Sequence, residues 1–181
     1  MKKRKIQVAL LAAVFLLTGG LFCWALADHD DDDHKSSKHH KKRYLNPVSN
    51  PTYKEECGAC HFAYQPELLP SGSWNKILGR LQDHFGDTVE LDPASRKVIG
   101  EYLTANAAEH SSAKRAVKIM RSLANRTPLR ITEIPYIREK HDEVSASVLK
   151  RDSIGSLSNC VACHTKAEAG IYDDDDVVIP R

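Results

Sequence analysis

Two short motifs with the same spacing contain four of the five cysteines of this chain. They read Cys57-Gly58-Ala59-Cys60-His61 and Cys160-Val161-Ala162-Cys163-His164, so both are C-x-x-C-H. On a helical turn the two sulfurs lie on one face, where they can form thioethers to one haem, and the following histidine points at the iron. The spacing therefore predicts two covalently bound c-type haems, attached through Cys57, Cys60, Cys160 and Cys163 and ligated by His61 and His164.

Zinc sites and redox-active dithiols also use paired cysteines. A zinc knuckle needs its two pairs close together, whereas Cys60 and Cys160 are 100 residues apart. A redox dithiol is expected beside a thioredoxin-like βαβ pattern, and the sequence shows none. Because neither alternative explains the histidine after each pair, haem attachment is the interpretation that we retain.

A six-coordinate haem iron needs a second axial ligand, usually methionine or histidine. Of the two methionines, Met1 lies at the start of the chain, and Met120 lies on an apolar helix face, where core packing is its more common role. His84 ends the apolar face of an expected helix, and His141 shares a face with two isoleucines. We predict His84 and His141 as the distal ligands, with His110, in a polar join between helices, as the alternative to either.

The first 27 residues have the pattern of an export signal. Basic residues 2–5 precede an apolar stretch over 6–26, and Ala25-Leu26-Ala27 is a small-x-small cleavage site, so Cys23 would be discarded. Cleavage lowers the number of basic residues from 26 to 22, against 24 acidic ones, which does not suggest a nucleic-acid binder. This predicts a periplasmic protein, anchored in the membrane if the signal is not cleaved.

Two charged segments flank the rest of the sequence. Residues 28–43 contain no apolar side chain and four histidines, so we expect a disordered leader that serves as a spacer, with loose metal binding as the alternative. Asp173 to Asp176 is expected to be a solvated face or a docking patch. It is not expected to be a calcium loop, because the spaced ligands and the glycine of such a loop are missing.

Helical periodicity dominates the remaining sequence. Helices are expected near residues 57–64, 73–85, 93–108, 112–125, 135–145 and 160–167, and no alternating run is long enough for a sheet. The expected fold is all-α, with little or no sheet and two small haem-binding lobes, over residues 44–110 and 111–181.

The order of these features resembles two known families. From Tyr53 to Ala108 the first motif, an apolar helix, His84-Phe85-Gly86 and a helix with Tyr102-Leu103 resemble a class I cytochrome c. In that family a distal methionine precedes the last helix, which supports His84 as the distal ligand here. Over Tyr53 to Arg181 the chain resembles the dihaem cytochrome c family, through Leu68-Leu69-Pro70, Ser73-Trp74, Asn106-Ala107-Ala108, Arg130-Ile131-Thr132-Glu133, Lys140-His141 and the second C-x-x-C-H.

The second resemblance implies a small, soluble, helical electron carrier with two bis-histidine haems. Some members of that family donate electrons to an oxygen-binding monohaem cytochrome c, and others accompany membrane b-type cytochromes. Proteins of these kinds are the expected partners of a protein that we expect to be monomeric.

Two protein ligands on each iron would leave no open position for a substrate. One-electron transfer is therefore the expected function, and no enzymatic activity is expected. Two alternatives stay open: a redox or gas sensor with one labile distal histidine, and the small electron-transfer subunit of a periplasmic reductase. A dihaem peroxidase would need an open iron and a much longer chain.

Overall fold

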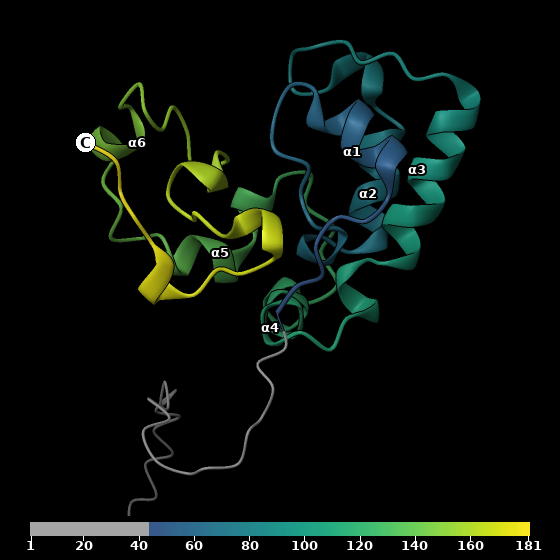
Figure 1. Ribbon diagram of the computed structural model, residues 1–181. Coiled ribbons are helices and arrows are strands. Elements are labelled where there is room, and N and C mark those ends of the chain that lie inside the picture. Colours follow the sequence, from purple (N-terminus) through teal and green to yellow (C-terminus); the bar gives the residue numbers. More distant parts are fainter. Residues whose placement is uncertain (1–43) are drawn as a thin grey trace, which may run out of the picture. The chain divides into compact units, whose positions relative to one another are not determined.

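The structure, a computed structural model, describes residues 44–181, so the expected signal and leader lie outside the described residues. The described part is helical and has no strand, as the sequence predicts, and it contains six α-helices. Figure 1 shows α1, α2 and α3 gathered on one side and α5 and α6 on the other, with α4 below. The helices are α1 (Pro51–Gly58), α2 (Ser71–Leu78), α3 (Pro93–Ala105), α4 (Lys114–Leu123), α5 (Pro135–Glu139) and α6 (Ala146–Leu149).

Capping residues fix where α1 and α3 begin. The Asn50 side chain accepts a hydrogen bond of 2.8 Å from the Tyr53 amide, and Pro51 takes the first helical position, where its missing N–H costs nothing. Asp92 caps α3 in the same way, ahead of Pro93. The expected helix over 57–64 is wrong because α1 begins at this cap and ends at Gly58, inside the first motif.

The second motif is also less helical than expected. Instead of a helix over 160–167, the chain forms a 3-10 turn over Cys160–Ala162. The expected helix over 73–85 ends early too, at Leu78, and a 3-10 turn over Leu81–Asp83 leads to His84. A single turn is enough to place the two cysteines and the histidine of a C-x-x-C-H motif.

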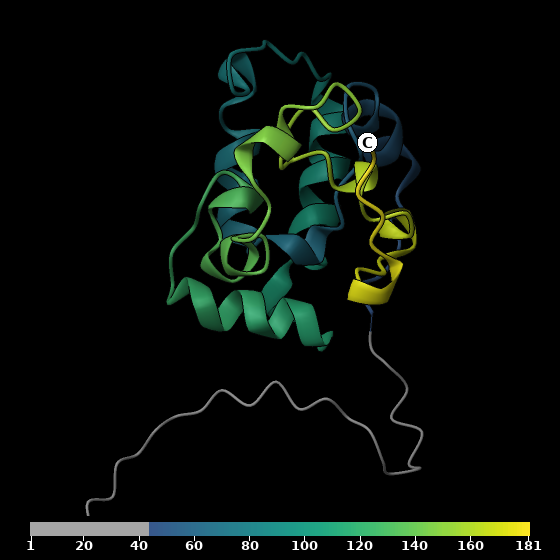
Figure 2. The same cartoon turned by 90° about the vertical axis from the view of Figure 1, so that its left-hand side faces the viewer.

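The core lies between α1, α2 and α3 and continues, past the turns at Pro66–Leu68 and Ala108–His110, to α4 and α5. Trp74 of α2 is buried, and its indole N–H donates a hydrogen bond of 2.8 Å to the Pro66 carbonyl. Met120 is partly buried against this core, in the packing role that its helical position indicates. Figure 2 shows α4 lying along one end of the other helices. The largest fully buried apolar side chains are Leu69, Ile99, Leu103, Ile119, Leu123 and Ile134.

Residues just after the first motif make buried hydrogen bonds to the second half of the chain. Gln65 is fully buried; its amide donates to the Ala167 carbonyl at 2.6 Å and accepts from the Tyr172 hydroxyl at 2.6 Å. The Leu45 amide donates to the Gly170 carbonyl at 3.3 Å. These bonds connect residues more than 100 positions apart.

The segment that includes the acidic block runs alongside the second motif. Val177 forms an isolated β-bridge with His164, and the Val178 amide donates to the Cys163 carbonyl at 2.9 Å. Asp176 pairs with Lys166 at 2.7 Å, and Asp173 accepts a hydrogen bond from a tyrosine hydroxyl. Part of the expected solvated face is therefore engaged with the chain itself.

No helix within residues 44–181 combines the length and the hydropathy that crossing a bilayer requires.

Two glycines with nearly the same backbone conformation offer a matched stability test. Gly170 and Gly155 have φ of +76° and +77°, but a Cβ at Gly170 would lie 2.0 Å from the Leu45 carbonyl oxygen, whereas a Cβ at Gly155 would meet nothing within 4 Å. We expect Gly155→Ala to cost about 1–2 kcal/mol through its backbone conformation. Gly170→Ala should cost roughly 2 kcal/mol more, because the segment at Leu45 must move. Guanidinium unfolding of the haem-loaded variants measures both; equal losses would contradict the contact.

The buried Gln65 amide gives a second stability test. Gln65→Leu leaves the Tyr172 hydroxyl and the Ala167 carbonyl without their partner in a buried place, so we expect a loss of about 2–4 kcal/mol. Gln82→Leu, at an exposed position, is the control and should change stability little. Urea unfolding followed by far-ultraviolet circular dichroism measures both variants, and a Gln65→Leu protein as stable as the control would contradict this prediction.

Candidate functional site

The four histidines that the sequence singles out as axial ligands lie in two pairs. The ring centroids of His61 and His84 are 6.2 Å apart, with their planes inclined by 14°. Those of His141 and His164 are 5.9 Å apart, with their planes inclined by 75°. His110, the alternative, is exposed at the end of a 3-10 turn over Ala108–His110.

These spacings fit two imidazoles that hold one metal between them. A metal–nitrogen bond of about 2 Å on each side, plus roughly 1 Å from each nitrogen to its ring centre, separates the two centroids by about 6 Å. One histidine of each pair directly follows two free cysteine thiols in the chain. The donor set of each site, two thiols and two facing imidazoles, fits a c-type haem.

Backbone carbonyls orient two of these imidazoles. His61 Nδ1 lies 2.8 Å from the Phe62 carbonyl, and His141 Nδ1 lies 2.7 Å from the Ile137 carbonyl. When Nδ1 carries the proton and donates it to a carbonyl, Nε2 is left free to bind a metal. His164 differs: within the described residues its buried Nδ1 has no hydrogen-bond partner, and its ring packs against Tyr172 at 5.3 Å.

Burial and neighbouring groups keep two of the imidazoles neutral. Burial, and then the facing His61, lower the pKa of His84. Burial, and then the facing His141, lower the pKa of His164. The neutral imidazole is the form that binds a metal, so both environments favour the ligand form at neutral pH.

The thiols of Cys57 and Cys160 have raised pKa values, unlike those of redox-active cysteines. Burial, followed by the nearby Glu56, raises the pKa of Cys57 to about 11. Burial likewise raises the pKa of Cys160 to about 11. Redox-active dithiols have lowered pKa values that expose a thiolate at neutral pH. The environments of these two cysteines are therefore those of attachment points and not of a dithiol catalyst.

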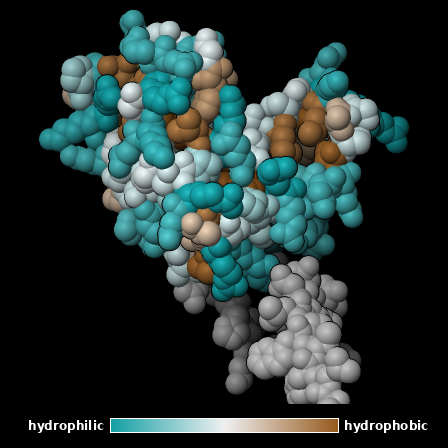
Figure 3. Space-filling model, turned by 180° about the vertical axis from the view of Figure 1, so that it is seen from behind, coloured by the Kyte–Doolittle hydropathy of each residue, from teal (hydrophilic) through white to brown (hydrophobic). Residues whose placement is uncertain are grey.

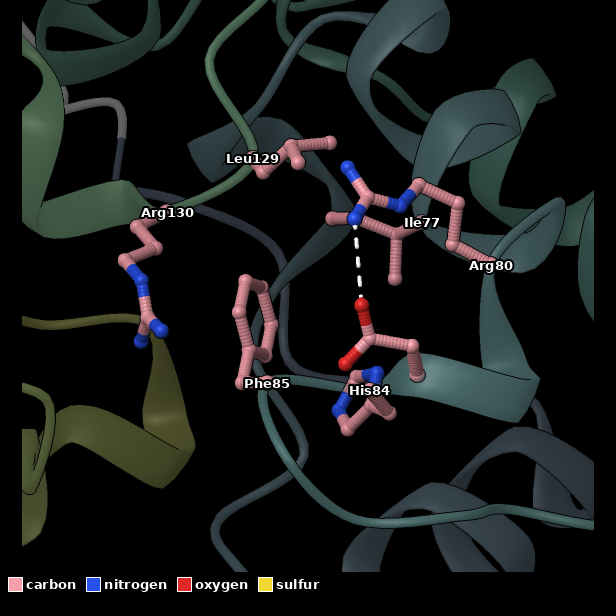
Figure 4. Close-up of a pocket in the computed structure, with 7 residues that line it drawn as sticks. Ile77, Arg80, His84, Phe85, Leu129 and Arg130 are labelled. Carbon is pink, nitrogen blue, oxygen red and sulfur yellow. Dashed lines mark hydrogen bonds and ion pairs between the residues drawn. The ribbon is translucent and has the colours of Figure 1, made fainter.

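A sharp turn presents His84. The His84 amide donates to the Asp87 carbonyl at 2.7 Å, and the Asp87 amide donates back to the His84 carbonyl at 3.3 Å. The two residues between them, Phe85 and Gly86, have φ of +61° and +109°. A cavity of about 220 Å³ lies beside this turn, and Figure 4 shows Phe85 among the residues that line it. The cavity is lined by Ile77, Arg80, Asp83, His84, Phe85, Leu129 and Arg130.

Tyr64 connects the two sites. Its ring lies 5.2 Å from the ring of His61, and its hydroxyl donates to the Ser158 carbonyl at 2.7 Å. The same carbonyl accepts from the Cys160 amide at 3.0 Å. Burial, followed by the nearby Cys160, raises the pKa of Tyr64 to about 12, so its hydroxyl keeps its proton. One side chain therefore touches a histidine of the first site and the segment that carries the second.

Sequence reasoning assigned no role to Tyr64, Phe85 or Arg130, although Phe85 and Arg130 lie in segments that carry the family resemblance. Tyr64 follows the first motif by three residues, which is a spacing without a meaning of its own. The Phe85-Gly86 pair is a weak turn signal, because phenylalanine is an unusual residue at a position with positive φ. The pairing of Arg130 with Phe85 spans 45 residues, and nothing in the local sequence indicates it.

Large apolar side chains remain partly exposed in both halves of the described chain. Figure 3 shows hydrophobic areas on one face of the molecule, separated by hydrophilic residues. Phe85, next to His84 in the first half, is 43% exposed. Val161, inside the second motif, is 38% exposed, next to the cysteines that would hold a haem. Apolar surface beside each site is what a large apolar cofactor can cover.

Comparison with known proteins identifies the family to which the chain belongs. The profile of the dihaem cytochrome c family matches residues 53–172. A dihaem cytochrome c from Rhodobacter sphaeroides is 46% identical, with a TM-score of 0.62, over 70% of this chain and 99% of that one. A structure of DHC purified from Rhodobacter sphaeroides is 43% identical, with a TM-score of 0.56, over 70% of this chain and 99% of that one.

A dihaem cytochrome c from Shewanella baltica is 38% identical, with a TM-score of 0.59, over 72% of this chain and 93% of that one. A search of curated proteins found no match. The family profile covers both C-x-x-C-H motifs and both histidine pairs. The chain therefore belongs to the dihaem cytochrome c family: it is an electron-transfer haem protein that carries two c-type haems.

Proposed function

We propose that this protein carries single electrons between redox partners through two bis-histidine haems. His61 and His84 would ligate the first iron, and His164 and His141 the second. This proposal rests on the distance between the two imidazole rings of each pair. Their centroids are 6.2 Å apart in the first pair and 5.9 Å apart in the second. Each haem, when bound, supplies an iron that changes between the ferric and ferrous states.

The protein's own residues keep this chemistry to electron transfer. Two histidines on each iron leave no position for oxygen, peroxide or another substrate. Bis-histidine ligation also keeps the reduction potential below that of an iron with a methionine ligand. The carbonyls of Phe62 and Ile137 hold His61 and His141 in the tautomer that binds iron.

We place the protein in the periplasm, as a monomer after cleavage of its signal. The basic n-region, apolar stretch and small-x-small site of residues 1–27 support export. Its partners on this proposal are other electron-transfer proteins, such as an oxygen-binding monohaem cytochrome c or a membrane b-type cytochrome. Family membership supports this choice of partner class.

The two ring geometries predict two distinguishable signals in low-temperature electron paramagnetic resonance of the oxidised protein. Axial ligands are a main influence on the electronic structure of haem iron. Nearly parallel imidazole planes separate in energy the two iron d orbitals that they contact, whereas nearly perpendicular planes leave them close together. We expect a rhombic low-spin signal from the first site, with planes at 14°, and a more anisotropic one from the second, at 75°.

The same samples test whether either iron is open. The ferrous protein should bind carbon monoxide only slowly, because a histidine must first leave the iron, and the oxidised protein should lack the red absorption band of methionine ligation. A high-spin signal together with rapid carbon monoxide binding would overturn the bis-histidine proposal and favour a sensor with a labile ligand.

Single histidine variants test the assignment of each ligand. We expect His84→Ala to remove the rhombic signal and His141→Ala to remove the anisotropic one, because each opens one iron. Each variant should then bind carbon monoxide rapidly at one of its two haems when reduced. His110→Ala is the matched control and should leave both signals unchanged. If His110→Ala opens an iron instead, the predicted pairing is wrong.

A further inference from the structure

The residue after His84 has a backbone conformation that its side chain disfavours. Three non-glycine residues of the described chain have positive φ: Phe85, Ala124 and Asn125. Ala124 and Asn125 follow the end of α4, where left-handed residues are common. Phe85 has no such explanation, because it lies in the tight turn from His84 to Asp87.

This turn would form more easily with another residue at position 85. Two-residue turns with positive φ at both central positions favour glycine, asparagine or aspartate. A bulky aromatic residue in the left-handed region is strained, and such strain persists only when contacts outside the turn hold the residue in place. The contacts of the Phe85 ring must therefore offset the strain of this turn.

The Phe85 ring lies between His84 and a cation from the second half of the chain. The Arg130 guanidinium carbon is 4.0 Å from the centre of the Phe85 ring, within the range of a cation–π contact. The His84 ring lies 4.9 Å from that of Phe85, with the planes inclined by 60°. Figure 4 shows Phe85 between Arg130 on one side and His84 and Ile77 on the other.

We propose that Phe85 and Arg130 form a clamp that keeps His84 at its position opposite His61. The inference rests on the proposed function, in which His84 is the distal ligand of the first iron. Both residues are positioning residues, since they act through His84. Arg130 holds the ring from outside the turn, and the ring in turn limits the movement of the adjacent imidazole.

The clamp explains why a strained residue stands beside a proposed ligand. A glycine or asparagine would relax the turn but would leave the His84 imidazole without its ring contact on this side. His84 is only partly buried, and within residues 44–181 its ring makes no hydrogen bond to a carbonyl of the kind that orients His61 and His141. A ring held by a cation from another segment takes the place of that hydrogen bond.

The test compares variants on both sides of the clamp in the haem-loaded protein. Phe85→Asn suits the turn, so the unfolding midpoint should stay at or above that of the wild type. The reduced variant should nevertheless bind carbon monoxide at one haem at least about tenfold faster, because His84 leaves its position more often. A role in packing alone would not separate stability from ligand binding in this way.

Variants of Arg130 test the clamp without changing the turn. Arg130→Gln should speed carbon monoxide binding in the same direction, and Arg130→Lys, which keeps the charge, should restore part of the wild-type behaviour. Arg126→Gln is the matched control. Arg126 lies in the same loop, and its guanidinium donates hydrogen bonds to two backbone carbonyls at the end of α4. This control variant should bind carbon monoxide as slowly as the wild type.

Two results would overturn the proposal, and they differ. If Phe85→Asn and Arg130→Gln both bind carbon monoxide no faster than Arg126→Gln, the clamp is wrong while bis-histidine ligation stands. If the wild type already binds carbon monoxide as readily as His84→Ala, His84 is not a stable ligand, and the proposed function falls together with the clamp.

Discussion

The fixed separation of two facing imidazole rings is the constraint on which the described structure depends. In each pair the two histidines are 23 residues apart in the sequence, and their ring centres lie about 6 Å from one another. The order differs, because the motif histidine comes first in one pair and last in the other. The chain between the two members of a pair must therefore leave a site and return to its opposite side, which a short helix and a turn achieve.

Buried polar contacts then set how the segments around the two sites meet. Glu67 is 3% exposed, and its carboxylate accepts hydrogen bonds from the Ser111 hydroxyl at 2.7 Å and from the Asn46 side chain at 3.0 Å. Gln65, two residues earlier, bonds to Ala167 and Tyr172. Because a buried polar group without a partner is costly, such contacts favour one arrangement of the segments over others.

The sequence predicts the chemistry of the sites better than their surroundings. Motif spacing indicates the four cysteines and the two histidines that follow them, and helical position together with elimination indicates His84 and His141, which the structure places opposite the motif histidines. Periodicity also predicts an all-helical fold. It misplaces the first helix, because the cap at Asn50 and Pro51 outweighs the apolar pattern after residue 57. The split into lobes at residue 110 stays a prediction.

The residues to which sequence reasoning assigns no role were missed for one physical reason. Tyr64, Phe85 and Arg130 act through contacts with segments 45 to 94 residues away, and such contacts leave no local pattern. Phe85 also has a positive φ, a backbone conformation that phenylalanine disfavours. Local propensity is expected to fail where outside contacts hold a strained residue.

The backbone hydrogen bond between Leu45 and Gly170 bears on the order in which parts of the fold form. The first described segment finds its partner only after residue 170 has been synthesised, so this contact closes a loop of nearly the whole described chain. Until then the first motif cannot be covered by its final neighbours from the second half. A loop of this length is costly to close, so the segments that carry the two C-x-x-C-H motifs reach their final places late in folding.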